Sequence, residues 1–465
     1  MLFSGIPFLY YFLPVVLMLY FAIPKKLKNT VLLISSLVFY GWGEPKYVIL
    51  MVASIVVGFF SGKLIEAKPA KRDKKLILFA SVFINLGFLA YFKYADFFIE
   101  NFNAITGIGV PLLRIALPIG ISFYTFQILS YTVDVYRGTP AQRNIINLAT
   151  YITMFPQLIA GPIVRYTDIA NQLEKRALCV DRFAEGFRRF IFGLSKKVLV
   201  ANILGELCDI FRASEDKAVL YYWLYAVAFA LHVYFDFSGY SDMAIGLGKI
   251  LGFDFCENFN YPFISKSATE FWRRWHISLG SWFRDYVYIP MGGNRVSRGR
   301  WLFNIFTVWM LTGFWHGAAW TFIIWGLYFA VFLCIEKLFL LKLLEKSKIL
   351  NRIYIFVVIG ISFVIFNATD MGEALEYIKA MLGFGNVPLV SQEFFYYLKS
   401  YAVPLLVAFV GATPLCKAVI NKFRERSVSE RLINILEPVV LVALLVVVTA
   451  FLVDGSFNPF LYFRF

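Results

Sequence analysis

The chain has 465 residues, of which 60% are hydrophobic, 19% aromatic and only 16% charged, and its mean hydropathy is +0.68. Average soluble domains are about 45–50% apolar and about 25% charged, so a soluble enzyme, a disordered chain and a disulfide-stapled secreted domain are excluded. The net charge of +15 is typical of a membrane protein that follows the positive-inside rule, so we expect no nucleic-acid partner. The apolar runs have helix length, which predicts an all-α polytopic integral membrane protein rather than an outer-membrane barrel.

Apolar runs of membrane-spanning type recur along the whole chain. They lie near 6–24, 29–43, 46–62, 76–94, 116–134, 218–237, 301–336, 351–367, 401–416 and 438–454. A weaker stretch near 190–210 is interrupted by Lys196 and Lys197. The run 301–336 is too long for one span of ~20 residues and predicts a hairpin or a broken pair. We therefore expect about 11 or 12 transmembrane helices.

The loops predict the orientation of these helices. Basic residues gather in 63–75, 337–352 and 417–431, whereas 95–113 and 368–399 are acidic or balanced. Loops rich in Lys and Arg stay in the cytoplasm. We therefore expect Lys68–Lys75 inside and residues 370–400 outside.

The middle of the chain mixes apolar patches with charge, Gly and Pro. The apolar stretch Leu148–Val164 contains Pro156, Gly161 and Pro162. Non-helical backbone at membrane depth survives only when it is buried in protein or lines a wet cavity. This stretch therefore predicts a re-entrant segment or a kinked helix.

The chain has three histidines, His232, His276 and His316, all in aromatic and apolar surroundings. His316 lies in LTGFWHGAAW, between Trp315 and Trp320 and among small residues. Intramembrane ionisable residues are costly and usually functional, and histidine suits proton transfer near neutrality. The alternative is a structural histidine that bonds a backbone carbonyl at a helix break. A metal site is not expected, because no second ligand lies at i+3 or i+4.

His276 lies in FWRRWHISLGSWFR, which predicts an interfacial amphipathic helix. Trp272 and His276 are four residues apart and would share one helix face. The basic side chains here are Arg273, Arg274 and Arg284. They could bind an anionic donor group such as a phosphate, or anchor the segment to anionic lipid.

His232 and Asp236 are also four residues apart, so the carboxylate could orient the imidazole. Asp236 belongs to a polar band with Ser238, Tyr240, Ser241 and Asp242 at a helix end. A structural, helix-terminating role is favoured for this band.

These motifs together resemble the membrane-bound O-acyltransferase family, and most closely its bacterial branch of alginate O-acetyltransferase membrane subunits and teichoic acid D-alanyl transfer proteins. The resemblance rests on His232–Phe263, Phe271–Arg295 and Phe314–Tyr328. Further segments that resemble the branch are Phe39–Pro45, Leu117–Gly138, Phe155–Tyr166 and Asn458–Phe465. It implies one family-type membrane domain over 1–465, with a motif-bearing core at about 117–336 and with re-entrant or interfacial helices around a central tunnel.

The resemblance also implies roles for individual residues. His316 falls on the family's near-invariant catalytic histidine, and His276 on its second functional position. Substrate-binding or tunnel positions are then Trp272, Arg273, Arg274, Trp275, Trp315 and Trp320. His316, kept neutral because desolvation disfavours the imidazolium ion, would act as general base toward a hydroxyl. His276 and nearby tryptophans would shape the donor entrance or help polarise the acyl carbonyl.

The implied function is the passage of an acetyl group from a cytoplasmic donor across a bacterial cell membrane, for O-acetylation of an extracellular or cell-wall polysaccharide. The donor would be a co-substrate, either acetyl-CoA or an acyl-carrier thioester, with no bound cofactor or metal. Expected partners are the lipid bilayer and, outside the cell, a polysaccharide acceptor or an SGNH-type acetyltransferase or esterase. The alternatives are D-alanyl transfer to teichoic acid, a transporter or flippase without chemistry, and a scaffold in a secretion complex.

Overall fold

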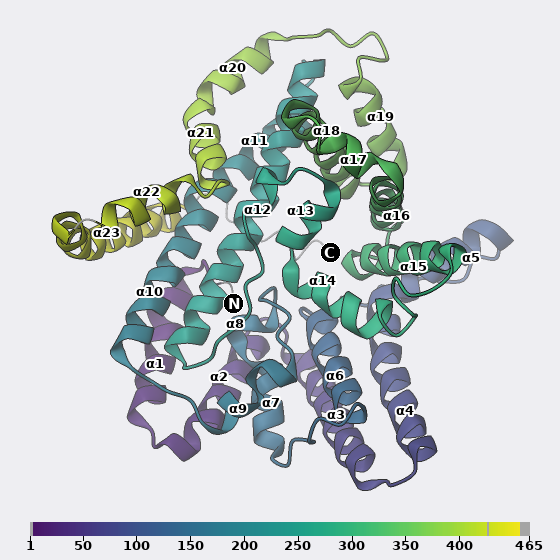
Figure 1. The fold of residues 1–465 in the computed structure, drawn as a ribbon, viewed down its shortest axis with the longest axis vertical. Helices are drawn as coiled ribbons and strands as arrows, with labels where there is room; N and C mark the ends of the chain where they lie inside the picture. The colour runs from purple at the N-terminus through teal and green to yellow at the C-terminus, as the bar shows by residue number, and fades with distance from the viewer. Residues whose placement is uncertain (1–2, 426, 456–465) are drawn as a thin grey trace. The chain divides into compact units, whose positions relative to one another are not determined.

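The computed structural model describes residues 3–425 and 427–455, and over these residues it is built from helices without a strand (Figure 1). The predicted all-α class is therefore confirmed. The ending Asn458–Phe465, which carried part of the resemblance, lies outside the described residues. The chain forms two compact units, Met1–Phe190 with Met243–Cys256, and Ile191–Asp242 with Glu257–Phe465.

The first unit is a helical assembly in which α6 packs against α3 and α4 (Figure 1). Its helices are η1 (Pro7–Phe12), α1 (Leu13–Ala22), η2 (Lys25–Leu27), α2 (Lys28–Gly41), η3 (Pro45–Tyr47), α3 (Val48–Ala67), α4 (Lys71–Leu89), η4 (Ala90–Tyr94), α5 (Ala95–Thr106), α6 (Ile121–Tyr136), α7 (Ile145–Thr153), α8 (Phe155–Leu158), α9 (Tyr166–Glu174) and α10 (Val180–Ser195). Gly58 and Gly62 of α3 face Ile128 and Tyr131 of α6, and a Cβ at Gly62 would overlap the tyrosine ring. Small residues thus let these helices approach closely.

The predicted break in Leu148–Val164 is confirmed. Helix α7 ends at Thr153, the backbone at Met154 leaves the helical region, and α8 begins with a proline in its first turn. Every residue of the stretch is buried. The Phe155 amide donates to Ser36 Oγ at 3.0 Å, so side chains satisfy backbone groups that the broken helix leaves unpaired.

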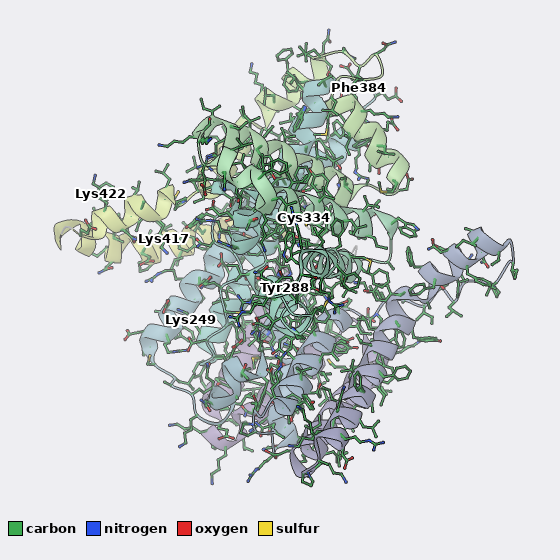
Figure 2. The ribbon with its side chains drawn as sticks, turned by 45° about the vertical axis from the view of Figure 1, so that its right-hand side comes forward. Lys249, Tyr288, Cys334, Phe384, Lys417 and Lys422 are labelled. Atoms are coloured by element: carbon green, nitrogen blue, oxygen red, sulfur yellow. The ribbon has the colours of Figure 1, made fainter. Side chains whose placement is uncertain are left out.

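The second unit carries the histidine motifs. Its helices are η5 (Lys196–Ala201), α11 (Asn202–Ala213), α12 (Val219–Ile250), η6 (Pro262–Ile264), α13 (Ala268–Arg274), α14 (Ile277–Phe283), η7 (Arg284–Tyr288), α15 (Arg298–His316), α16 (Trp320–Ile335), η8 (Glu336–Leu340), α17 (Leu341–Leu344), α18 (Lys348–Asn367), α19 (Met371–Met381), α20 (Gln392–Ser400), α21 (Ala402–Gly411), α22 (Leu415–Arg424) and α23 (Ser427–Val453). Part of the predicted basic loop 417–431 is helical, with Lys417 and Lys422 exposed along α22 (Figure 2).

The predicted hairpin in 301–336 is confirmed as α15 and α16, with the break after His316. The two helices touch backbone to backbone at Gly313 and Gly326. A Cβ on Gly313 would overlap the Phe322 carbonyl, and a Cβ on Gly326 would overlap the Trp309 carbonyl. The predicted role of small residues in close helix approach is therefore seen here.

The lysines that weaken the 190–210 stretch are both paired with acids of α12. Lys196 Nζ lies 2.7 Å from Asp242 Oδ2, and Lys197 Nζ lies 2.7 Å from Asp236 Oδ1. The second pair is buried, with the two side chains 2% and 1% exposed. Gly239 makes the approach possible, because a Cβ there would lie 2.7 Å from the Gly193 carbonyl oxygen.

The Asp236 carboxylate pairs with Lys197, whereas the His232 ring hydrogen-bonds a backbone carbonyl. His232 Nδ1 lies 2.6 Å from the Ala201 carbonyl oxygen. A backbone carbonyl only accepts, so Nδ1 donates the proton in this bond. Asp236, Asp242 and His232 thus have structural partners, but the predicted helix end is wrong, because α12 runs from Val219 to Ile250 and the polar band lies inside it.

Fewer helices are long enough to span a membrane than the apolar runs predicted. Among the described residues, six helices qualify by length and composition, or seven when the pair α20–α21, bent by 60°, counts as one span. The six are Pro45–Ala67, Lys71–Thr106, Val219–Ile250, Trp320–Leu344, Lys348–Asn367 and Leu432–Val453. Other predicted runs form shorter helices, such as Pro7–Ala22, or lie in helices of lower hydropathy, such as α15. The multi-pass organisation holds, whereas the predicted count of 11 or 12 exceeds this number.

Candidate active site

His276 sits at a break between two short helices. α13 ends at Arg274, and His276 has the left-handed backbone angles φ 45° and ψ 52°. A single helix over Phe271–Arg284 was predicted, with Trp272 and His276 on one face, and this prediction is wrong. The cause is tertiary, because Asn258 and Asn260 take backbone bonds that a continuous helix would use. The Ile277 amide donates to the Asn258 carbonyl at 3.0 Å, and the Asn260 amide donates to the Arg274 carbonyl at 2.9 Å.

A buried carboxylate holds the start of α13. Glu336, 1% exposed, accepts from the Ala268 amide at 2.6 Å, the Thr269 amide at 2.9 Å and the Thr269 hydroxyl at 2.6 Å. The Tyr354 hydroxyl of α18 also donates to it, at 2.8 Å. These amides belong to the first turn of α13, where a helix leaves donors unpaired and favours negative charge. Glu336 thus ties the helix that carries Trp272 and Arg273 to α16 and α18.

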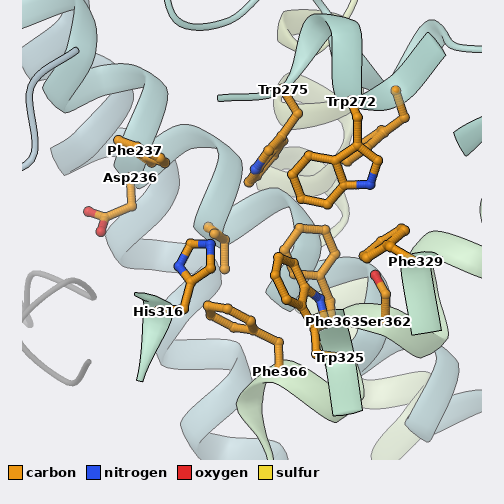
Figure 3. Close-up of a pocket in the computed structure, with 12 residues that line it drawn as sticks. Asp236, Phe237, Trp272, Trp275, His316, Trp325, Phe329, Ser362, Phe363 and Phe366 are labelled. Carbon is orange, nitrogen blue, oxygen red and sulfur yellow. The ribbon is translucent and has the colours of Figure 1, made fainter. Parts of the chain in front are cut away.

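A small aromatic cavity surrounds His316. The cavity has a volume of about 30 Å³, and Asp236 is the carboxylate that lines it together with aromatic side chains (Figure 3). The lining residues are Val233, Asp236, Phe237, Phe271, Trp272, Trp275, His316, Trp325, Phe329, Ser362, Phe363 and Phe366. The imidazole, on a residue only 7% exposed, meets Trp325 and Phe366 edge-on, with ring centroids 5.1 and 5.4 Å away. His316 therefore lies in a water-poor pocket at the end of α15.

A second, larger cavity of about 750 Å³ lies beside it and is lined by His276. Its volume falls in the range of small-molecule sites. Its polar and charged lining residues are Thr269, Trp272, Arg273, His276, Ser281, Arg284, Tyr288, Asn294, Trp301, Thr312 and Lys337. Arg273, Arg284 and Lys337 are exposed, and no Asp or Glu is among the described residues that line this cavity. We call this the basic cavity.

Tryptophans separate the two cavities. Trp272 lines both of them. Trp315 lies between the two histidines, with its ring centroid 6.0 Å from that of His276 and 5.0 Å from that of His316. The structure thus places the two predicted catalytic histidines on neighbouring cavities with indole rings between them.

The other predicted site residues fall in different places. Trp275 lines the His316 cavity, and Arg273 lines the basic cavity. Arg274 lines neither cavity, because its guanidinium bonds Glu270 at 2.9 Å and the Asn260 carbonyl at 3.1 Å. Trp320 lines neither cavity and is 53% exposed at the start of α16. The two histidine motifs therefore contain residues that line the cavities as well as residues that do not.

Burial sets the electrostatics of His276. The residue is 1% exposed and lies outside the candidate membrane-spanning helices. Desolvation lowers its pKa from the usual value to about 3, because the charged imidazolium loses its hydration. At neutral pH the ring is uncharged.

Sequence reasoning missed Asn258, Glu336 and Lys337 as parts of the site. The sequence places Glu336 at the end of a long apolar run, where burying a carboxylate is costly unless other groups bond it. Lys337 was counted only as a charge of a basic loop. Nothing near Asn258 in the sequence pointed to His276, eighteen residues further on.

The fold and the two cavities define a multi-pass helical membrane protein with a buried histidine beside a basic, ligand-sized cavity. Among the described residues, no group of three or more His, Cys, Asp or Glu side chains is placed to hold a metal ion. The model of the MBOAT, membrane-bound O-acyltransferase family matches residues 73–369. The chain belongs to this family: it is an O-acyltransferase and a multi-pass protein of the bacterial membrane.

Relatives extend the match over most of the chain. The protein named "Probable alginate O-acetylase AlgI" of Azotobacter vinelandii is 44% identical over 83% of this chain and 79% of that protein. The peptidoglycan O-acetyltransferase of Helicobacter pylori is 34% identical over 84% of this chain and 81% of that protein. The teichoic acid D-alanyltransferase of Bacillus subtilis is 32% identical over 48% of this chain and 59% of that protein.

Proposed function

We propose that the chain transfers an acetyl group from a cytoplasmic thioester donor to a hydroxyl group of an extracellular or cell-wall polysaccharide, with His316 as general base. The observation that carries this proposal is the pairing of a small, largely aromatic cavity that holds His316 with the basic cavity across Trp272. The names of the Azotobacter and Helicobacter relatives favour acetyl transfer to a polymer. The D-alanyl alternative rests on a similarity that covers only 48% of the chain.

The basic cavity fits an anionic donor. Arg273 and Lys337 supply positive charge, and guanidinium groups bind phosphate through forked hydrogen bonds. Arg284 also lines the cavity, but its guanidinium bonds Asp285 at 2.7 and 3.1 Å. Both acetyl-CoA and the phosphopantetheine arm of an acyl-carrier protein carry phosphate at one end of a pantetheine arm and the thioester at the other. Lys337 begins the basic stretch 337–352. The structure makes most of this predicted loop helical, in η8, α17 and the start of α18, and we expect it on the cytoplasmic side, where either donor is made.

The chemistry follows from the positions of the two cavities. His316 takes the proton of the acceptor hydroxyl, whose oxygen then forms a bond to the thioester carbonyl carbon. The carbon–sulfur bond breaks, and the thiol leaves with the proton. The Trp272 indole nitrogen is buried, and no described residue accepts its hydrogen, so it is suited to bond the carbonyl oxygen as negative charge develops. The aromatic walls keep out water that would hydrolyse the thioester.

The acceptor outside the membrane is a polymer hydroxyl or a serine of an SGNH-type partner that passes the acetyl group on. Proteoliposomes that contain the chain, with labelled acetyl-CoA outside and alginate oligomers inside, distinguish these two routes. Label on the oligomer without a partner supports direct transfer, whereas transfer only after a partner is added supports the relay. Replacing acetyl-CoA with an acetylated carrier protein identifies the donor.

His316→Gln is the decisive variant for the base role, because glutamine keeps hydrogen bonding but does not take a proton at neutral pH. We expect transfer to fall by at least ~10²-fold, which is the low end of what general acid–base catalysis contributes. Protein level and insertion should stay near wild type. Near wild-type transfer by His316→Gln would remove the base role and favour a transporter or scaffold.

The orientation has its own test. Single cysteines in Lys68–Lys75 should resist an impermeant thiol reagent in intact cells, and cysteines in 370–400 should react. The background for this experiment lacks the five native cysteines, two of which, Cys179 and Cys416, are exposed. Labelling of the first loop from outside would reverse the orientation and move the basic cavity away from the cytoplasmic donor.

A further inference from the structure

Asn258 makes several hydrogen bonds to the turn that carries His276. Its backbone carbonyl accepts from the Ile277 amide at 3.0 Å. Its side-chain oxygen Oδ1 accepts from the Ser278 amide at 3.2 Å and from the Ser278 hydroxyl at 2.9 Å. The same oxygen lies 3.3 Å from His276 Nδ1. One buried asparagine, 1% exposed, thus contacts three successive residues of the turn.

The Ser278 amide determines which way the asparagine side chain points. A backbone N–H only donates, so the atom that faces it is the carbonyl oxygen and not the amide nitrogen of Asn258. Because Oδ1 only accepts, the His276 nitrogen beside it must donate. This contact places the single proton of the neutral ring on Nδ1.

We propose that Asn258 is a positioning residue that holds His276 as the neutral tautomer protonated on Nδ1, so that Nε2 carries the lone pair at the basic cavity. The proposal rests on the role of His276 in donor handling under the proposed function. His276 then accepts a hydrogen bond from the donor molecule, for example from an amide N–H of a pantetheine arm. It does not donate one to the acyl carbonyl, which leaves that task to an indole such as Trp272.

The surroundings of the ring keep this tautomer neutral. The groups that face it include the Phe237 ring of α12, with centroids 4.7 Å apart, the Trp315 ring of α15 and Asn258. The cavity that His276 lines also holds the cations Arg273, Arg284 and Lys337. None of these groups titrates near neutral pH. Burial adds to the effect, because it lowers the pKa of His276 far below the physiological range.

The test compares Asn258→Ala, His276→Ala and the double variant in proteoliposomes, with acetyl-CoA as donor and alginate oligomers as acceptor. Asn258→Ala should lose roughly 10- to 100-fold in transfer, the loss that follows when the orienting partner of a functional histidine is removed from a metal site. The double variant should be no worse than His276→Ala, because Asn258 acts through the imidazole. Asn260→Ala is the matched control, since Asn260 uses only its backbone in this turn, and it should keep wild-type transfer.

Asn258→Asp separates positioning from packing. An aspartate keeps an acceptor oxygen for Ser278 and His276, so transfer at pH 8 should return to within about threefold of wild type. The added negative charge favours the imidazolium ion, so the acid limb of the pH profile should move up by at least one pH unit. A purely structural asparagine would give the same pH profile as wild type in every variant with residual activity.

The outcomes distinguish the two proposals. If His276→Ala is impaired and Asn258→Ala keeps wild-type transfer, the positioning role is overturned while the proposed function stands. Additive losses in the double variant, or an Asn258→Asp acid limb at the wild-type position, overturn it as well. If His276→Ala itself keeps full transfer, then the donor role of His276 fails, and the positioning role fails with it.

Discussion

Replacing Glu336 with glutamine tests how strongly the carboxylate holds α13. In the native protein, Oε1 accepts from the Ala268 amide and the Tyr354 hydroxyl, at 2.6 and 2.8 Å. Oε2 accepts from the Thr269 amide and hydroxyl, at 2.9 and 2.6 Å. A glutamine has one oxygen, so its NH₂ group faces one of the two backbone amides. The hydroxyl beside that amide can rotate and accept instead, but the amide cannot.

The expected cost is therefore that of one buried amide without an acceptor. We expect a loss of about 2 kcal/mol in the free energy of unfolding, the middle of the range for an unsatisfied buried donor. Thr269 also lines the basic cavity, so the KM for the donor should rise more than kcat falls. Unfolding of the purified protein by SDS in mixed micelles measures the first effect, and initial rates in proteoliposomes measure the second.

Glu345→Gln is the matched control, because Glu345 is exposed directly after the end of the same helical span and should tolerate the change. A Glu336→Gln protein that unfolds within 0.5 kcal/mol of wild type, a limit set well below the usual ~1 kcal/mol of one hydrogen bond, would refute the reasoning. The start of α13 would then be held by other contacts.

Other positions give further predictions. Gly313→Ala should cost about 1–3 kcal/mol in SDS unfolding, because a Cβ there meets backbone of the facing helix, whereas Gly299→Ala, in open space on α15, should cost nothing. Arg273→Ala should raise the donor KM about tenfold with little change in kcat, as expected for the loss of one charged contact. Arg274→Ala should instead lower stability, because Arg274 pairs with Glu270. A large rise in KM for Arg274→Ala but not for Arg273→Ala would contradict the assignment. Burial lowers the pKa of His276 to about 3, so between pH 6.5 and 3 the unfolded chain binds a proton that the folded chain does not. Stability should consequently fall as the pH is lowered from 6.5 to 3, more steeply in wild type than in His276→Gln, as equilibrium unfolding at several pH values would show. Equal slopes would place His276 in a more polar setting.

The sequence was most informative where one local signal determined the structure. The length of 301–336, with Gly317 and two alanines near its middle, was enough to predict the α15–α16 hairpin. Pro156 and Gly161 were enough to predict the break in the buried 148–164 stretch. Both cases depend on residues that end a helix by their own chemistry.

The sequence was less informative where a distant partner decides the outcome. The local pattern around His276 favours one helix, and only the bonds from Asn258 and Asn260 divide it into α13 and α14. Motif membership likewise did not separate Arg273, at the cavity, from Arg274, which pairs with Glu270. Such distinctions depend on contacts between segments, which the order of residues does not display.

The two lysine–aspartate pairs between η5 and α12 also bear on how the chain enters the bilayer during synthesis. On translocon scales, a lysine or an aspartate at the centre of a helix costs about 2.5–3.5 kcal/mol, so the segment with Lys196 and Lys197 is poorly suited to leave the translocon alone. Helix α12, which follows α11, brings Asp236 and Asp242, which lie 2.7 Å from those lysines in the folded protein. We expect the two segments to partition into lipid together as one hairpin, so that the first segment leaves the translocon only after the second has been synthesised. An Asp236→Asn change should then lower the amount of correctly inserted protein, because misinserted chains are degraded. This loss would precede any effect on a step of catalysis.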